Sequence, residues 1–204
     1  IAEVKCNVAI YNENAKFISA HNIYMYNLYV GANFDLFGKT LFIYGKIVYD
    51  TDFNNDFRIR NTKPKAGKIV IYNTEEYVYD YTPQSIKIDR LRTLKVIPPG
   101  GMSMPNLDVA LVNSLSVDTL QVNGFLNLAG RNLTIGKTTT SIGFLDVDSL
   151  GSTGALGTLT LLGNSATPAY VLSAKDLNNI NVNNPAGVEL NNAFNISPLS
   201  DSYA

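Results

Sequence analysis

The residues best suited to metal binding or acid–base chemistry lie in one short segment of the first half of the chain. It holds three carboxylates followed by two guanidinium groups: Asp50, Asp52, Asp56, Arg58 and Arg60. Clustered carboxylates can hold Ca²⁺, and grouped Asp and Arg side chains can serve a polysaccharide lyase or hydrolase. The segment lacks the glycine and terminal glutamate of an EF-hand loop, and acidic residues are also common turn formers. A calcium or polysaccharide site and a solvated acidic turn therefore both remain open.

Nucleophilic catalysis and structural zinc binding need residues that the chain scarcely contains. His21 and Cys6 are the single histidine and the single cysteine. A Ser/His/Asp or Cys/His arrangement would have to use His21, and a zinc site of several His and Cys ligands cannot be assembled. We interpret His21 as a polar residue at the start of a strand. The chain is expected to be non-enzymatic and to need no cofactor, with Ca²⁺ at the acidic segment as the alternative.

Tyrosines are the second group of candidate binding residues, and they concentrate in the first half. Alternate side chains of a strand point to opposite faces, so Tyr24 and Tyr26 are expected to share one face. An exposed tyrosine row can stack on sugar rings or contact a protein at little entropic cost. The alternative is that these rings pack against the core or beneath loops. The binding candidates are Tyr24, Tyr26, Tyr29, Tyr44, Tyr49, Tyr77, Tyr79 and Tyr81.

Charge and hydropathy exclude some partners. The net charge is −1, so the overall field favours neither nucleic acid nor an anionic membrane. The first hundred residues hold 13 basic and 10 acidic side chains, a net +3, and the remainder hold 3 and 7, a net −4. No apolar run reaches the roughly 18 residues that span a bilayer, so direct membrane insertion is not expected. The chain begins at Ile1 rather than Met, as a processed product or an excised fragment would.

The elements that must position these side chains are short strands. Small phrases of two aliphatic residues around a polar one recur, and their two aliphatic side chains share a face. Helical periodicity is nearly absent, which predicts an all-β chain. Three of these tripeptides are equally spaced: Leu107-Asp108-Val109, Leu126-Asn127-Leu128 and Leu145-Asp146-Val147. Two more are separated by almost the same interval: Leu115-Ser116-Val117 and Leu133-Thr134-Ile135.

This spacing predicts a solenoid. A period of about 18–20 residues with about three short strands is what one coil of a right-handed parallel β-helix needs, and all of these intervals fall within it. Leu28 and Ile47, separated by the same interval as Leu107 and Leu126, extend the period into the first half. Short strands with frequent turns also occur in a β-sandwich or jelly roll, which is the alternative fold.

Breaks in the rhythm divide the chain into three parts. Residues 1–97 are expected to form a Tyr-rich, irregular solenoid segment with loop insertions at Asp50 to Lys65 and Asn73 to Ser85. Residues 98–106 hold most of "VIPPGGMSMPN" and are expected to be a Pro/Gly loop. Residues 107–204 are expected to form a regular Leu/Asn/Gly-rich solenoid segment.

Three features of the sequence resemble those of a known class of proteins: repeated phrases such as "LNLAGRNLTIG", the abundance of Asn, Thr and Gly, and the scarcity of cysteine. The chain resembles the β-helical passenger segments of bacterial secreted surface proteins, the autotransporter and filamentous-haemagglutinin-like adhesins. The resemblance implies an extracellular or cell-surface adhesin or assembly protein. Its partner would be a glycan, a surface protein or copies of itself, in a homo-oligomer or end to end. The alternative is a carbohydrate-active β-helix enzyme or tailspike-like depolymerase that uses the acidic segment.

Overall fold

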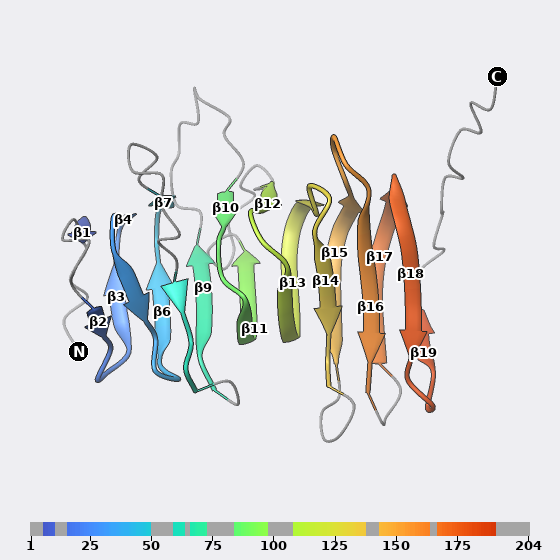
Figure 1. The fold of residues 1–204 in the computed structure, drawn as a ribbon, viewed down its shortest axis with the longest axis horizontal. Helices are drawn as coiled ribbons and strands as arrows, with labels where there is room; N and C mark the ends of the chain where they lie inside the picture. Colours follow the sequence, from blue (N-terminus) through green and yellow to red (C-terminus); the bar gives the residue numbers. More distant parts are fainter. Residues whose placement is uncertain are drawn as a thin grey trace.

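The chain is all-β in the computed structural model. The structure describes residues 6–10, 16–49, 59–63, 66–72, 84–97, 108–137, 143–163 and 167–190. These residues form nineteen strands and no helix. The strands stand side by side along the longest axis of the molecule, from β1–β3 at one end to β18 and β19 at the other (Figure 1). None of the described residues forms a helix long and apolar enough to cross a membrane.

The strands form three sheets. Two small sheets have the orders β1 (Val8–Ile10), β4 (Leu28–Val30), β7 (Ile47–Tyr49) and β2 (Lys16–Ile18), β5 (Asn33–Asp35), β8 (Ile59–Arg60). The third sheet contains β3 (Ile23–Met25), β6 (Thr40–Ile43), β9 (Lys68–Tyr72), β10 (Gln84–Ile86), β11 (Arg90–Ile97), β12 (Val109–Leu111), β13 (Leu115–Asn127), β14 (Asn132–Ile135), β15 (Phe144–Gly151), β16 (Gly157–Leu162), β17 (Thr167–Lys175), β18 (Leu177–Asn183) and β19 (Val188–Leu190).

Every strand pair among the described residues is parallel. Parallel neighbours need long connections, because the chain must return to the same end before it can pair again. Sandwiches and jelly rolls are built from antiparallel strands. The alternative fold is therefore not supported, and the all-β, parallel part of the prediction is confirmed.

Two of the predicted spacings are strand registers. Leu28 lies opposite Ile47 in the β4–β7 pair. Leu115 lies opposite Leu133 in the β13–β14 pair. At these two places the spacing of the aliphatic phrases correctly predicted which strands are neighbours.

The other predicted spacing was wrong. Leu126 does not lie opposite Leu145, the next phrase of the equally spaced series, but opposite Leu150, and Leu145 lies opposite Leu120. Register separations vary widely, from the short step that joins Val109 to Leu126 to the long one that joins Leu41 to Ile69. The predicted period of about 18–20 residues was thus too narrow, because loops of different lengths separate strands whose apolar faces nevertheless align.

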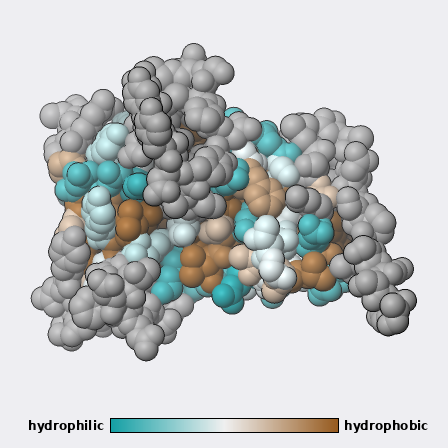
Figure 2. All heavy atoms as spheres, turned by 90° about the horizontal axis from the view of Figure 1, so that it is seen from above, coloured by the Kyte–Doolittle hydropathy of each residue, from teal (hydrophilic) through white to brown (hydrophobic). Residues whose placement is uncertain are grey.

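Aliphatic side chains on the inner faces of the strands form the core. Each buried side chain of this size contributes about 1.5–3 kcal/mol of hydrophobic free energy. In successive strands of the large sheet five such residues lie in register and are 0% exposed: Leu41, Ile69, Leu94, Leu120 and Leu145. Seen from above, the hydrophobic residues that are coloured on this face are interspersed with hydrophilic ones rather than gathered in one continuous band (Figure 2). The inward placement predicted for the Leu and Val of the repeated phrases is confirmed for those among the described residues.

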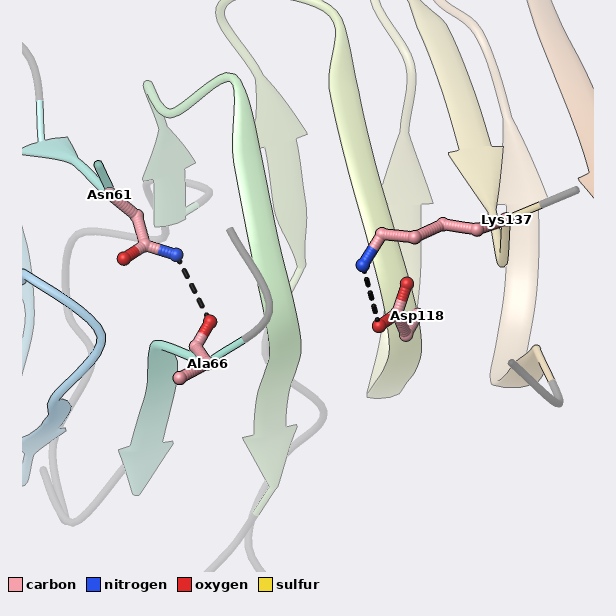
Figure 3. A network of polar contacts seen from close by, with 4 residues as sticks. All are labelled: Asn61, Ala66, Asp118 and Lys137. Carbon is pink, nitrogen blue, oxygen red and sulfur yellow. Dashed lines mark hydrogen bonds and ion pairs between the residues drawn. The ribbon is translucent and has the colours of Figure 1, made fainter. Parts of the chain in front are cut away.

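Asparagine side chains close the corners between strands. The Asn61 amide donates to the carbonyl oxygen of Ala66 at 3.0 Å (Figure 3). The same side chain accepts from the backbone N–H of Gly38 at 3.0 Å. The same amide lies where a side chain on Gly67 would sit, since a Cβ there would overlap its nitrogen. Gly67 also has a φ of +80°, which favours glycine. The corner therefore needs both an asparagine and a glycine.

The strands continue on both sides of the predicted Pro/Gly loop. Residues 98–106 lie outside the described residues, but β11 before them pairs with β13 after them, and β10 pairs with β12. Strand β8 lies inside the segment predicted as an insertion and pairs with β5. A strand of two residues carries too little periodicity to be recognised from the sequence.

Candidate aromatic binding surface

Two rings stack on the outer side of β3 and β6. Tyr24 lies opposite Phe42 in register, with 4.5 Å between ring centroids and 6° between ring planes. Both strands turn their aliphatic residues inward, since Met25, Leu41 and Ile43 are at most 2% exposed. Alternation along the strand then places Tyr24 and Phe42 outside. Both residues are half-buried.

The stack continues onto β9. The Tyr72 ring lies 6.4 Å from that of Phe42, with 3° between the planes, and 5.4 Å from that of Tyr44, with 28°. Tyr44 and Tyr72 each follow a buried isoleucine, Ile43 and Ile71, and so fall on the outer side. We call these four half-buried rings the aromatic ladder: Tyr24, Phe42, Tyr44 and Tyr72.

The geometry of the ladder limits what it can bind. Rings that stack with nearly parallel planes turn their faces toward one another, so the edges and the tyrosine hydroxyls are what a ligand meets. A sugar ring binds against an aromatic face, and only a ring at the end of the ladder keeps one. Tyr24 is such a ring, because β3 ends the described sheet. A protein surface can use the edges of all four rings, since tyrosine combines an apolar body with a hydrogen-bonding tip.

The other predicted tyrosines are not part of the ladder in the described structure. Tyr29 lies on β4, opposite Val48 and in a different sheet, and is half-buried. Tyr26 follows β3, is half-buried, and makes backbone hydrogen bonds to Cys6 and Gly45. Tyr77, Tyr79 and Tyr81 lie outside the described residues.

Tyr49 has a structural position. It shares the face of Ile47 on β7 and packs against the hydrophobic core. Its hydroxyl oxygen accepts a hydrogen bond of 3.0 Å from the backbone N–H of Lys87. Burial raises the pKa of the Tyr49 hydroxyl far above its ordinary value, and the Lys87 hydrogen bond lowers it only in part.

Phe42 and Tyr72 complete the ladder but were not among the sequence candidates. Phe42 stands one predicted coil after Tyr24, and that signal was available in the sequence. Tyr72 stands much further beyond Tyr44 than the predicted period reaches. Only the observed register of β6 with β9 brings those two rings together.

Most of the predicted Asp/Arg site lies outside the described residues. Asp50, Asp52, Asp56 and Arg58 lie outside the described residues. Arg60 is exposed at the end of β8, opposite Asp35 in register. Within the described ranges, no group of three or more His, Cys, Asp or Glu side chains could hold a metal ion.

Asp35 has a structural role in the turns beside Arg60. Its carboxylate accepts hydrogen bonds from the backbone N–H groups of Phe37 and Thr62 and from the Thr62 hydroxyl, at 2.8, 3.1 and 2.7 Å. Burial by itself raises the pKa of Asp35, but these hydrogen bonds and the charge of Arg60 outweigh it and lower the pKa. The carboxylate is thus held ionised as a clamp between two turns.

A second polar contact joins β13 to the end of β14. The Lys137 ammonium lies 3.0 Å from one carboxylate oxygen of Asp118, with side chains 29% and 13% exposed (Figure 3). The other oxygen of Asp118 is buried without a hydrogen-bond partner among the described residues. The pair ties the neighbouring strands β13 and β14 together.

Comparisons with known proteins add no relative. No protein-family model, no curated protein and no solved structure matches the chain. The candidate site therefore rests on the geometry of the aromatic ladder alone.

Proposed function

We infer that the protein is a non-enzymatic adhesive scaffold of a bacterial surface, a right-handed parallel β-helix that binds its partner along the aromatic ladder. The observation that carries the adhesive role is the row of four half-buried rings on one outer face. Tyrosine and phenylalanine are enriched where proteins meet partners, because they bury a large area at little entropic cost.

The β-helical part of the proposal rests on the order of the strands. Through β9 the chain pairs each strand with the one three places earlier: β4 with β1, β5 with β2, and so on to β9 with β6. A chain that returns after every third strand winds around a common core. The right hand of the coil follows from the strong preference of parallel crossover connections.

The ladder favours a protein as the partner. Its ring faces are largely turned toward one another, so it offers mainly ring edges and tyrosine hydroxyls, with an end face at Tyr24. A flat protein surface can contact all four edges together, whereas a glycan would have to stack at the end. Binding of a glycan is the alternative outcome of the experiment below.

The test removes two ladder rings that carry hydroxyls. The double variant Tyr24→Ser/Tyr44→Ser and the control Tyr29→Ser would be applied to arrays of extracellular-matrix proteins and of glycans. Tyr29 matches in residue type and burial but lies on another sheet. We expect the wild type and the control to bind a protein target and the double variant to bind it at least about tenfold more weakly, a loss of about 1.4 kcal/mol.

Thermal unfolding followed by circular dichroism would show that the double variant is folded. Binding to glycans alone would identify the alternative partner. A wild type that binds neither array, or a folded double variant that binds as tightly as the wild type, would overturn the proposal.

A further inference from the structure

Both ends of the strand stack carry edges that pair on one side only. Within the described residues β1 pairs with β4 alone, β2 with β5 and β3 with β6. At the opposite end β18 pairs with β16 alone and β19 with β17. Within the described residues, such edges present backbone donors and acceptors without a strand partner, and edges of this kind are templates for another strand.

The core side chains are uncovered at the same two ends. Phe17 of β2 stacks on the fully buried Phe34, with 5.0 Å between centroids, yet is 45% exposed. Val182 of β18 lies opposite Leu161, which is 3% exposed, yet is itself 54% exposed. Each is the last side chain of an inward-facing column, and the next one in the column would bury it.

From these two ends we propose that the chain assembles head to tail, with the β1–β3 end of one copy stacked on the β18–β19 end of the next. The partner at each end is a second copy of the chain. A strand of that copy would make the same kind of parallel pairing that neighbouring strands within the chain already make. All described strand pairs are parallel, so a copy shifted along the axis can continue the parallel pairing at β18 and β19, whereas head-to-head stacking would make the new pairs antiparallel.

Charge favours the same arrangement. The first hundred residues carry a net +3 and the remainder −4. Head-to-tail stacking brings halves of opposite sign together, and head-to-head or tail-to-tail stacking brings like signs together. A heterologous contact of this kind does not close on itself, so the product is a linear filament. The proposal rests on the β-helical architecture proposed above, but it does not depend on the ladder.

The test uses two end variants that complement one another. Phe17→Asp disables the β1–β3 end and Val182→Asp the β18–β19 end, and each leaves the other end intact. The control Val112→Asp changes a valine that is 38% exposed at the end of β12, between the two ends. Masses would be measured by sedimentation velocity over a series of protein concentrations and at low and high salt.

We expect the mass of the wild type and of Val112→Asp to grow with concentration, and less so at high salt. Each end variant alone should self-associate at least tenfold more weakly. An equimolar mixture of the two end variants should form a dimer, because it contains one intact end of each kind.

A wild type that is monomeric at all concentrations would overturn the proposal, as would a mixture that stays monomeric while both variants are folded. Failure of the ladder to bind a partner is a separate result, since Val182→Asp keeps the ladder and can be tested on the arrays as a monomer.

Discussion

The ring of Tyr24 lies parallel to the ring of Phe42 on the outside of neighbouring strands, with 4.5 Å between centroids and 6° between planes. This contact does not depend on burial in the core, because both residues are half-buried on the outer face. It joins β3 to β6, strands that stand one predicted coil apart in the chain.

The stacking of Tyr24 on Phe42 should appear as a coupling in stability. Replacing either ring by leucine removes the same contact, so the double variant should lose less free energy of unfolding than the two single variants together. We expect a coupling of about 0.5–1.5 kcal/mol, the range for aromatic pairs. Chemical denaturation of the four proteins of the cycle measures it, and additive losses would contradict the contact.

Asp148→Asn should stabilise the protein at neutral pH. Burial raises the pKa of Asp148, Asp146 raises it further by repulsion, and the backbone N–H of Gly124 lowers it only in part. The pKa of Asp148 is higher in the folded than in the unfolded protein, so ionisation of Asp148 destabilises the fold. The stability of the protein therefore falls as the pH rises from the unfolded pKa through the folded pKa. Asparagine keeps the acceptor for Gly124 and removes the charge.

The gain from Asp148→Asn should therefore be present at pH 7 and vanish below about pH 3.8, the ordinary value for this carboxyl. Denaturation midpoints across this range measure it. Asp176→Asn, at an exposed position, is the matched control. An equal gain at all pH values would rule out the electrostatic cause.

Tyr49→Phe should destabilise the protein although it removes a single oxygen atom. The variant removes the acceptor that the half-buried Lys87 N–H has at 3.0 Å, and the loss of one such hydrogen bond costs about 0.5–1.5 kcal/mol. Tyr29→Phe, on an outer face, should change the free energy of unfolding by less than about 0.5 kcal/mol. A smaller loss for Tyr49→Phe than for Tyr29→Phe would refute the structural role of Tyr49.

The raised pKa of Tyr49 gives the wild type a further alkaline dependence. The unfolded hydroxyl ionises near its ordinary value of 10.0 and the folded one does not. The contribution of Tyr49 to stability is thus present below about pH 10 and is lost as the pH rises above it. Thermal unfolding near and above that pH should show a smaller alkaline loss in Tyr49→Phe than in the wild type.

Gly67→Ala should cost more than Gly154→Ala. Both glycines have a left-handed φ, +80° and +84°, so alanine is strained at either by about 1–2 kcal/mol. At Gly67 a Cβ would also overlap the amide nitrogen of Asn61, whereas at Gly154 nothing lies within 4 Å. Chemical denaturation of both variants gives the two losses, and their difference isolates the corner contact. Equal losses would show that Asn61 moves aside freely.

The inner face of the strands was readable from the amino-acid sequence. Leu115 and Leu133 both precede a polar residue and a β-branched one, and this local pattern is enough to point them inward and, at the predicted spacing, to pair them. The same alternation puts Tyr49 on the face of Ile47, and the structure places both against the core. Side-chain direction depends only on the nearest neighbours along the strand, so the sequence alone determined it.

Which outer side chains meet was decided by the tertiary structure. Tyr44 reaches Tyr72 only because β6 pairs with β9 across a separation wider than the predicted period, and Leu126 lies opposite Leu150 rather than Leu145. The lengths of the connecting loops set these registers, and a loop can grow at small entropic cost without moving the strands that it joins. The sequence by itself therefore determined an all-β chain of strands with an aliphatic inner face. The tertiary structure decided the aromatic ladder, because its contacts run across strands whose separation no local pattern encodes.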